Sequence, residues 1–214
     1  MKKKLIVIGA GGHAKVVIDS VDRREYEVAG ILDKDLLHIH EQINGVPIIG
    51  IDGDAERYFS EGVHHAFIAI GHIGDAGIRS RLFSRLKAIG YHMINIIHPA
   101  AIISESSRLG EGNLIMPNCV INAEARIGNN TIINTGAIIE HDVIIEDNVH
   151  LAPGSIVAGM SMIGNGSFIG AGSTILQNLH IGTNVTIGAG STVIHDMPDN
   201  VVAVGSPARE IRRK

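Results

Sequence analysis

An aliphatic residue returns every six positions through the second half of this chain. From Ile97 to Val193 each sixth residue is Ile, Leu or Val, seventeen positions without interruption. Small or β-branched side chains often follow four residues later, and Gly, Asn and Asp crowd the positions between, as in Ile127-Gly-Asn-Asn. A period of six fits neither the turn of an α-helix, about 3.6 residues, nor the strand spacing of a β-sandwich, about 8–12 residues. It is typical of a β-helix, in which short parallel strands stack and bury the aliphatic series.

The composition agrees with narrow stacked coils and excludes several classes of protein. Aromatic residues make up 3% of the 214 residues and tryptophan is absent, as expected where the interior accommodates Ile, Val, Ala and Ser. A net charge of −4 argues against a nucleic-acid partner. The apolar run after residues 2–4 breaks at Gly9, too early for a signal peptide, and no stretch approaches the length of a membrane span. We therefore expect a cytoplasmic protein with no membrane insertion.

Cysteine and histidine usage indicates no metal site. The single cysteine, Cys119, rules out an intramolecular disulfide framework. It stands at a repeat position otherwise filled by small residues, and we interpret it as a packing residue. His38 with His40 and His64 with His65 are close in sequence, but no cysteine or carboxylate group completes a recognisable metal-binding spacing. The sequence therefore predicts no bound metal and solvated histidines at these four positions.

The first half of the chain alternates predicted strands and helices. Residues 5–8 have the continuous aliphatic character of a buried parallel strand, and residues 15–21 follow as a helix. Further strands are predicted at 26–32, 65–70 and 93–97. A helix at 75–90 would place Ile78, Leu82, Leu86 and Ile89 on one face. This order implies a small Rossmann-like parallel α/β domain over residues 1–96, followed by a β-helix domain over 97–214.

A glycine-rich turn joins the first predicted strand to the first helix. Gly9-x-Gly11-x-x-Ala14 matches the dinucleotide fingerprint, with Asp33 twenty-four residues after Gly9. Such a turn directs backbone N–H groups and the positive end of a helix at an anion. NAD is the obvious ligand, but the short domain has room for one nucleotide-binding half, so a single nucleotide diphosphate fits better. A glycine turn with no ligand stays an alternative.

Four motifs spread over nearly the whole chain resemble those of one family. They are Gly9-Ala-Gly-Gly-His-Ala-Lys15, Phe67-Ile-Ala-Ile-Gly71, Ile97-His-Pro and Ile139-Glu-His-Asp. The chain resembles the sialic acid O-acetyltransferase family, which includes the UDP-4-amino-sugar N-acetyltransferases of bacterial glycan synthesis. Its Ile-Gly repeats also resemble the hexapeptide acyltransferase signature. The resemblance implies a left-handed parallel β-helix with three hexapeptides per turn, a homotrimer with active sites between subunits, and acetyl-CoA as co-substrate.

The resemblance also implies roles for individual residues. The amino-terminal domain would bind the UDP part of the sugar nucleotide. The residues implied to bind substrate are Gly11, Gly12, His13, Asp33, Lys34 and Gly71, with Asp33 and Lys34 at the nucleoside end. Asn134, at the turn after Ile133, is a further candidate for holding the acceptor or facing the oxyanion. Those implied to hold acetyl-CoA are His150, Ala171 and Ala189, the two alanines through their backbone. Simple packing is an alternative for the alanines, as is an asparagine ladder for Asn134.

His141 is the candidate catalytic residue. Acyl transfer from a thioester needs a base that accepts a proton from the acceptor, and histidine is the usual one. Glu140 and Asp142 flank His141, and an acidic neighbour orients the ring and stabilises its protonated form. A lone turn histidine is commonly only solvated, but the family motif carries its catalytic histidine here and implies that Asp142 raises its basicity.

The sequence therefore predicts an acetyl-CoA-dependent N-acetyltransferase acting on the 4-amino group of a UDP-amino-dideoxysugar. The acyl group would pass directly to the acceptor, with no acyl-enzyme. Two alternatives stay open, one with the same chemistry and one without catalysis. One is O-acetylation of sialic acid or a related sugar, which uses the same base and donor. The other is a protein without catalysis, either a β-helix scaffold or a nucleotide-binding sensor.

Overall fold

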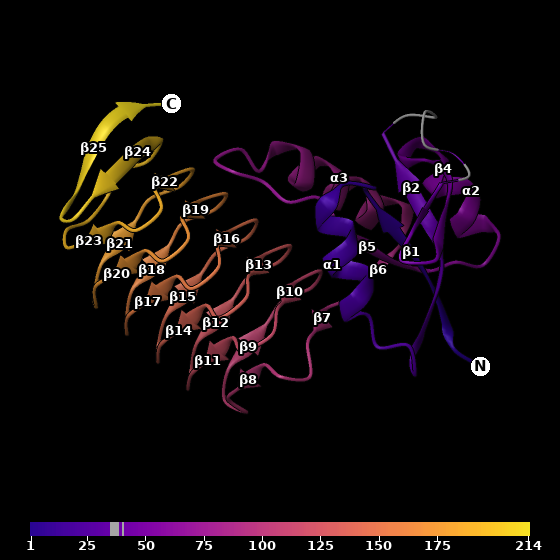
Figure 1. The fold of residues 1–214 in the computed structure, drawn as a ribbon, viewed down its shortest axis with the longest axis horizontal. Coiled ribbons are helices and arrows are strands. Elements are labelled where there is room, and N and C mark those ends of the chain that lie inside the picture. Colours follow the sequence, from indigo (N-terminus) through magenta and orange to yellow (C-terminus); the bar gives the residue numbers. More distant parts are fainter. Residues whose placement is uncertain (35–38, 40) are drawn as a thin grey trace. The chain divides into compact units, whose positions relative to one another are not determined.

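The computed structural model describes residues 1–34, 39 and 41–214, and the chain divides into two compact units (Figure 1). Unit 1 comprises Met1–Gly71 and Arg79–Ile96, and unit 2 comprises His72–Ile78 and Ile97–Lys214. The segment His72–Ile78 thus belongs with the repeat although it precedes it in sequence. His38 and His40 lie outside the described residues.

Unit 1 is a mostly parallel sheet with helices, as predicted. Its strands lie in the order β3-β4-β2-β1-β5-β6, and all neighbours are parallel except β3 and β4. The strands are β1 (Lys3–Ile8), β2 (Tyr26–Asp33), β3 (Gln42–Ile43), β4 (Val46–Ile51), β5 (His65–Ile68) and β6 (His92–Met93). The helices are α1 (Gly12–Ser20), the short 3-10 helix η1 (Asp52–Asp54), α2 (Ala55–Ser60) and α3 (Gly77–Ile89). The elements between Gln42 and Ser60 were not predicted.

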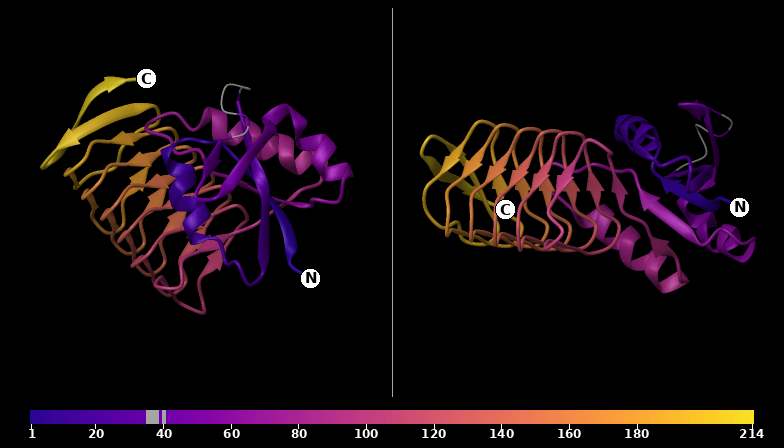
Figure 2. Two further views of the ribbon diagram at one scale, coloured as in Figure 1. Left: turned by 45° about the vertical axis from the view of Figure 1, so that its right-hand side comes forward. Right: turned by 90° about the horizontal axis from the view of Figure 1, so that it is seen from below.

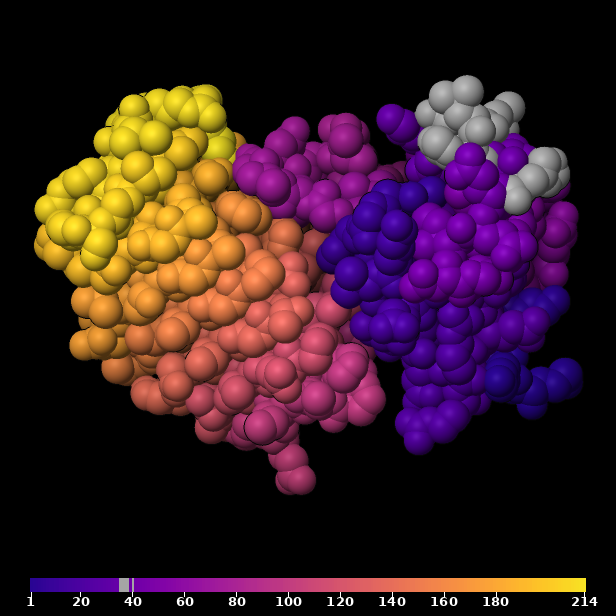
Figure 3. Space-filling model, in the orientation of Figure 1, coloured from indigo at the N-terminus to yellow at the C-terminus, as the bar shows by residue number. Residues whose placement is uncertain are grey.

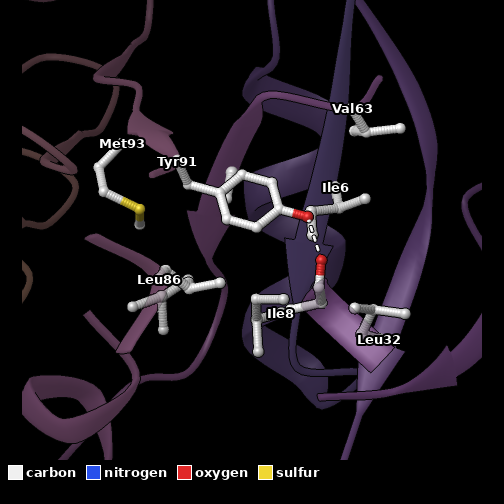
Figure 4. Close-up of a cluster of buried hydrophobic side chains, with 10 residues drawn as sticks. Ile6, Ile8, Leu32, Val63, Leu86, Tyr91 and Met93 are labelled. Atoms are coloured by element: carbon white, nitrogen blue, oxygen red, sulfur yellow. Dashed lines mark hydrogen bonds between the residues drawn. The ribbon is translucent and has the colours of Figure 1, made fainter. Parts of the chain in front are cut away.

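A buried cluster joins the central strands of unit 1 to α3. It includes Ile6, Ile8, Leu32, Val63, Leu86, Tyr91 and Met93 (Figure 4). The Tyr91 hydroxyl donates a hydrogen bond of 2.7 Å to the Ala55 carbonyl. Burial raises the pKa of Tyr91 to about 12. The hydrogen bond satisfies a polar group that would otherwise be costly in this apolar setting.

The predicted inner face of α3 is partly wrong. Leu86 is buried as expected, but Ile78 is 54% exposed and Arg79 is only 1% exposed. The Arg79 guanidinium donates to the carbonyls of Ile68 and Ile70, at 3.0 and 2.5 Å. These carbonyls lie where the chain leaves β5, and the buried Arg79 guanidinium provides them with hydrogen-bond donors. Burial lowers the pKa of Arg79 to about 9.

Unit 2 is the parallel β-helix that the period of six predicts. Strands of two residues, together with the longer β24 and β25, form three sheets (Figure 2). Sheet I contains β7 (Ile96–Ile97), β10 (Leu114–Ile115), β13 (Ile132–Ile133), β16 (His150–Leu151), β19 (Phe168–Ile169), β22 (Thr186–Ile187), β24 (Val201–Gly205) and β25 (Ala208–Arg213). Sheet II contains β8 (Ile102–Ile103), β11 (Val120–Ile121), β14 (Ile138–Ile139), β17 (Ile156–Val157), β20 (Thr174–Ile175) and β23 (Thr192–Val193). Sheet III contains β9 (Arg108–Leu109), β12 (Arg126–Ile127), β15 (Ile144–Ile145), β18 (Met162–Ile163) and β21 (His180–Ile181).

The strand register shows three hexapeptides per turn. Leu114 pairs with Ile132, and Ile132 with His150, so each residue lies against the residue eighteen positions later. The aliphatic series is buried from Ile115 onward, whereas Ile97, at the start of the stack, is 41% exposed. The coils follow one another to the hairpin of β24 and β25 (Figure 1), and in the space-filling view the colour passes along the repeat in sequence order to the yellow C-terminal residues (Figure 3). The interior is therefore one continuous aliphatic column.

Buried serines also line this interior, and the hydroxyls of Ser167 and Ser173 find hydrogen-bond partners in the backbone. Ser167 Oγ donates to the Gly182 carbonyl at 2.9 Å and accepts from the Val185 N–H at 2.9 Å. Ser173 Oγ likewise donates to the Gly188 carbonyl at 2.7 Å. Each hydroxyl thus bonds the backbone of the next coil, which makes these small side chains suitable for a narrow core.

Each coil turns at three corners, and most corners need a residue with left-handed backbone. Corner I–II, between sheets I and II, uses Asn118, Gly136, Gly154, Gly172 and Gly190. Corner III–I uses Gly112, Asn130, Asn148, Gly166 and Asn184. Corner II–III uses Glu124, Asp142, Met160 and Asn178. Only Gly adopts this conformation at no cost, and Asn or Asp adopt it most readily among the others.

Candidate active site

His141 and Asp142 lie together at corner II–III, between β14 and β15. His141 Nδ1 is 2.8 Å from Asp142 Oδ2, and each side chain is 56% exposed. With the carboxylate ionised, Nδ1 is the donor, which leaves the Nε2 lone pair of a neutral ring available to accept a proton. The pair therefore has the geometry of a general base held in one tautomer by its neighbour.

A second His-Asp dipeptide at the same corner lacks this geometry. His195 and Asp196 stand three coils after His141 and Asp142. Asp196 Oδ1 instead accepts a 2.8 Å hydrogen bond from the backbone N–H of His180. The dipeptide alone is thus insufficient, and the backbone around it determines whether the carboxylate meets the imidazole.

The residues stacked on Asp142 have an unusual backbone. Glu124 and Met160 have φ of +58° and +61°, and among the described residues they alone have positive φ without being Gly, Asn or Asp. Backbone hydrogen bonds from Asp142 N to Ala123 O and from Met160 N to His141 O, both 3.0 Å, connect their coils directly. Strained backbone of this kind concentrates at functional sites. The sequence analysis missed both residues, although writing the chain in rows of eighteen aligns them with Asp142.

The residues implied to hold the cofactor lie at or beside a different corner. Asn134, Ala171 and Ala189 follow strands of sheet I at corner I–II, and both alanines are exposed. His150, in β16 of sheet I, is only 8% exposed. One chain therefore does not bring these residues together with His141.

His150 anchors the segment His72–Ile78 to the coils. Its Nδ1 lies 2.8 Å from the His72 carbonyl oxygen, which only accepts, so Nδ1 carries the proton. Its Nε2 lies 3.3 Å from Asn134 Nδ2, so the Asn134 amide is the donor there. The ring also packs edge-to-face with His72 and Phe168. The structure thus fixes the tautomer of His150.

In unit 1 the glycine turn connects β1 to the start of α1. Gly9 needs to be glycine, because its φ is +104° and a Cβ there would lie 2.5 Å from the Ile70 side chain. Gly11 and Gly12 do not have positive φ, and no heavy atom of the described residues lies within 4 Å of an added Cβ. Their lack of a side chain leaves open space at the positive end of α1, where an anion is favoured.

Other implied substrate residues gather around this turn. Asp33 Oδ1 accepts a 3.3 Å hydrogen bond from the Ala10 N–H. A Cβ on Gly71 would lie 3.7 Å from His13 Cγ, so His13 and Gly71 are neighbours. Lys34 is exposed. These residues follow β1, β2 and β5; β1 lies between the other two, and ligands of open α/β sheets bind at the point where the strand order reverses.

The described residues contain no group of three or more His, Cys, Asp or Glu side chains arranged to hold a metal. Cys119 is fully buried, and its thiol donates to the Asn134 carbonyl at 3.0 Å. Burial raises the pKa of the Cys119 thiol, which disfavours the nucleophilic thiolate. Within the described chain, no helix is both long and apolar enough to cross a membrane.

Comparison with known proteins places both halves of the chain. Residues 4–86 match the PglD N-terminal domain family. Residues 106–137, 124–159 and 160–195 match the bacterial transferase hexapeptide family. A stretch of 107 residues is 35% identical to an uncharacterised protein of Acanthamoeba polyphaga mimivirus, and this match covers 50% of the chain and 20% of the viral protein.

Solved structures resemble the whole chain. Perosamine N-acetyltransferase from Caulobacter crescentus, in complex with CoA and GDP-perosamine, is 38% identical with a TM-score of 0.92, over 98% of this chain and 97% of that one. Two of its structures are variants in which that enzyme's His141 is replaced by Asn or by Ala. The acetyltransferase domain of PglB from Neisseria gonorrhoeae is 33% identical with a TM-score of 0.89, over 98% of this chain and 100% of that one, and a second structure of it contains acetyl coenzyme A.

These matches confirm the predicted Rossmann-like domain followed along the chain by a left-handed β-helix of hexapeptide repeats. They support sugar N-acetyltransferases rather than sialic acid O-acetyltransferases in particular. With relatives above 30% identity matched over nearly their full length, the chain belongs to the acetyl-CoA-dependent sugar acetyltransferases with hexapeptide repeats.

Proposed function

We propose that this protein transfers the acetyl group of acetyl-CoA to the 4-amino group of a UDP-linked amino-dideoxysugar in bacterial glycan synthesis. His141 acts as the general base, and no acyl-enzyme forms. The observation that carries the proposal is the 2.8 Å pair of His141 and Asp142 on an exposed corner of the β-helix. Two structures of the Caulobacter crescentus relative have that enzyme's own His141 substituted, which supports a catalytic role for the histidine at this position.

The chemistry follows from the tautomer of His141. As the neutral acceptor amine attacks the thioester carbon, Nε2 accepts its proton and Asp142 stabilises the resulting imidazolium through Nδ1–H. Collapse of the tetrahedral intermediate breaks the carbon–sulfur bond. The imidazolium then returns its proton to the CoA sulfur, so atoms and charge balance without a covalent enzyme intermediate.

Unit 1 is proposed to bind the nucleotide part of the sugar nucleotide. The backbone N–H groups of Gly11, Gly12 and the first turn of α1 would donate hydrogen bonds to a diphosphate, with His13 and Gly71 beside it. Asp33 and Lys34 would bind the nucleoside end. In the described residues the sheet adds only the two-residue β6 beyond β5, which supports one nucleotide rather than a dinucleotide.

A GDP-sugar is the second candidate, because the Caulobacter crescentus relative binds GDP-perosamine. Uracil and guanine differ in size and in donor pattern, so the two nucleotides require different contacts beyond Asp33 and Lys34. The reaction at His141 would be the same for both. The choice between them changes the substrate and leaves the mechanism intact.

A homotrimer is proposed because one chain leaves the implied catalytic and cofactor residues at different corners. His150, Asn134 and the backbone at Ala171 and Ala189 would hold acetyl-CoA and acceptor beside the His141 corner of a neighbouring subunit. Sheet II supports this assembly with an outward ladder of Ile102, Val120, Ile138 and Ile156, of which Ile102 is 67% exposed. An apolar ladder on an outer face is typical of an interface.

Thiol release from acetyl-CoA tests the proposal across UDP- and GDP-linked 4-amino sugars, with sialic acid and a 4-hydroxy UDP-sugar as controls. We expect turnover only with an amino sugar nucleotide, and fastest with a UDP-sugar. Preference for sialic acid would establish O-acetylation instead. No thiol release with any acceptor would favour the scaffold or sensor alternatives.

A further inference from the structure

The His141 ring lies over a glycine of the next coil. A Cβ on Gly159, eighteen residues after His141, would lie 2.7 Å from Nε2, 2.8 Å from Cε1 and 3.3 Å from Cδ2 of that ring. The first two distances are shorter than real carbon contacts allow, so the imidazole would have to move. The three atoms nearest to this Cβ thus all belong to the His141 ring.

The backbone gives no reason for glycine at this position. Gly159 does not have positive φ. Ala123, two coils earlier at the same corner, shows that an alanine fits the equivalent backbone. Other glycines of the coils differ, because a Cβ on Gly164 or Gly170 would lie within 2.7 Å of backbone atoms in the next coil. Those glycines allow the coils to stack, whereas the nearest atoms that a Cβ on Gly159 would meet all belong to the His141 ring.

We infer that Gly159 is a positioning residue for the catalytic base, an inference that rests on the proposed function. The His141 ring lies against Gly159, and the Asp142 carboxylate holds the Nδ1 atom of that ring. Together they direct Nε2 to one place. A methyl group at position 159 would tilt the ring, lengthen the contact between Nδ1 and Asp142 Oδ2, and misdirect Nε2 while leaving the coil intact.

The test is Gly159→Ala, measured for kcat and for the KM of each substrate. We expect kcat to fall by up to about 10²-fold, the loss typical of a misplacement of about 1 Å. Both KM values should stay within about twofold, because ground-state binding is unaltered. The melting temperature should match wild type, since the displaced ring is exposed. Gly53→Ala is the matched control, because a Cβ there makes an ordinary 3.4 Å contact with Ile51 Cδ1.

A double-mutant cycle with His141→Ala separates this role from steric exclusion of acetyl-CoA. If Gly159 acts through the ring, Gly159→Ala adds no further loss once His141 is alanine. An equal loss in both backgrounds, or a rise in the KM of acetyl-CoA in both, would overturn the inference. So would unchanged kcat in Gly159→Ala. If His141→Ala itself leaves kcat unchanged, the proposed function fails instead.

Discussion

The glycine turn of unit 1 and corner II–III of unit 2 break the usual relation between backbone and residue type in opposite directions. At the turn, Gly11 and Gly12 are glycine where φ does not require it. At the corner, Glu124 and Met160 have left-handed backbone that glycine or asparagine would adopt more readily. Corners I–II and III–I have only Gly and Asn at their left-handed positions.

The fold alone selects the residue type at some of these positions and not at others. At the two regular corners residue type follows from conformation, and nothing more is needed to explain it. At the turn and at corner II–III something besides conformation has selected the residue. These are the regions where we propose that the phosphate binds and that the catalytic base acts.

The largest effect is expected for His141→Ala. General base catalysis contributes about 10²–10⁴-fold, so kcat should fall by that factor while calorimetry still detects acetyl-CoA binding. His195→Ala is the matched control, because it lies at the same corner beside an aspartate that bonds backbone instead. A His141→Ala enzyme with more than half of wild-type kcat would remove His141 from the mechanism.

Asp142→Asn should cause a smaller loss. Asparagine adopts positive φ readily, so the coil is preserved, but the hydrogen bond to the developing imidazolium loses its ionic character. A difference of about 1–2 kcal/mol between charged and neutral hydrogen bonds corresponds to roughly tenfold or somewhat more in rate. Steady-state kinetics with an amino sugar nucleotide measures this loss. A rate equal to that of wild type would show that the carboxylate only forms the turn.

The comparison between corners predicts an opposite pair of stability changes. Met160→Asn should raise the free energy of unfolding by about 1 kcal/mol, because the exposed methionine pays a left-handed penalty that asparagine largely avoids. Asn178→Met, one coil later at the same corner, should lower it by a similar amount. Chemical denaturation measures both. Destabilisation by Met160→Asn would mean that packing, not function, selected the methionine.

Cys119→Ala should change turnover least, because direct transfer uses no thiol. Burial raises the pKa of the Cys119 thiol from an ordinary value of 9.0. Below that pH the thiol is neutral in both the folded and the unfolded chain, and its stabilising contribution is complete. This contribution is lost as the pH rises through the raised pKa, because the thiol of the unfolded chain ionises first. Wild type should therefore lose stability above about pH 9 relative to Cys119→Ala. An inactive variant with native mass and melting behaviour would revive an acyl-enzyme.

The sequence predicts best what repeats. The aliphatic series fixes the coil from Ile97 to Val193, because each buried position recurs with the same side-chain chemistry. The glycine turn before α1 and the His141–Asp142 pair are predicted by motifs. The region between Gln42 and Ser60 is not, because Pro47, Gly50 and Gly53 interrupt its short apolar runs.

Other features depend on residues that only folding brings together. The bond between His150 and the His72 carbonyl joins residues seventy-eight positions apart, and neither side of it has a sequence signature. The burial of Arg79 likewise depends on where the chain leaves β5. Gly159, Glu124 and Met160 stand out only once the register of eighteen residues per coil is known.

Calorimetry of the wild-type protein with UDP, GDP and NAD tests most directly whether the glycine turn holds a sugar nucleotide. We predict that UDP or a UDP-sugar binds and that NAD does not. In Gly11→Val the added side chain enters the open space at the start of α1, so the nucleotide should bind far more weakly while acetyl-CoA binding is unchanged. Binding of GDP in place of UDP would identify the substrate as a GDP-sugar. Micromolar binding of NAD, with no binding of UDP or GDP, would contradict the assignment of the glycine turn to a sugar nucleotide.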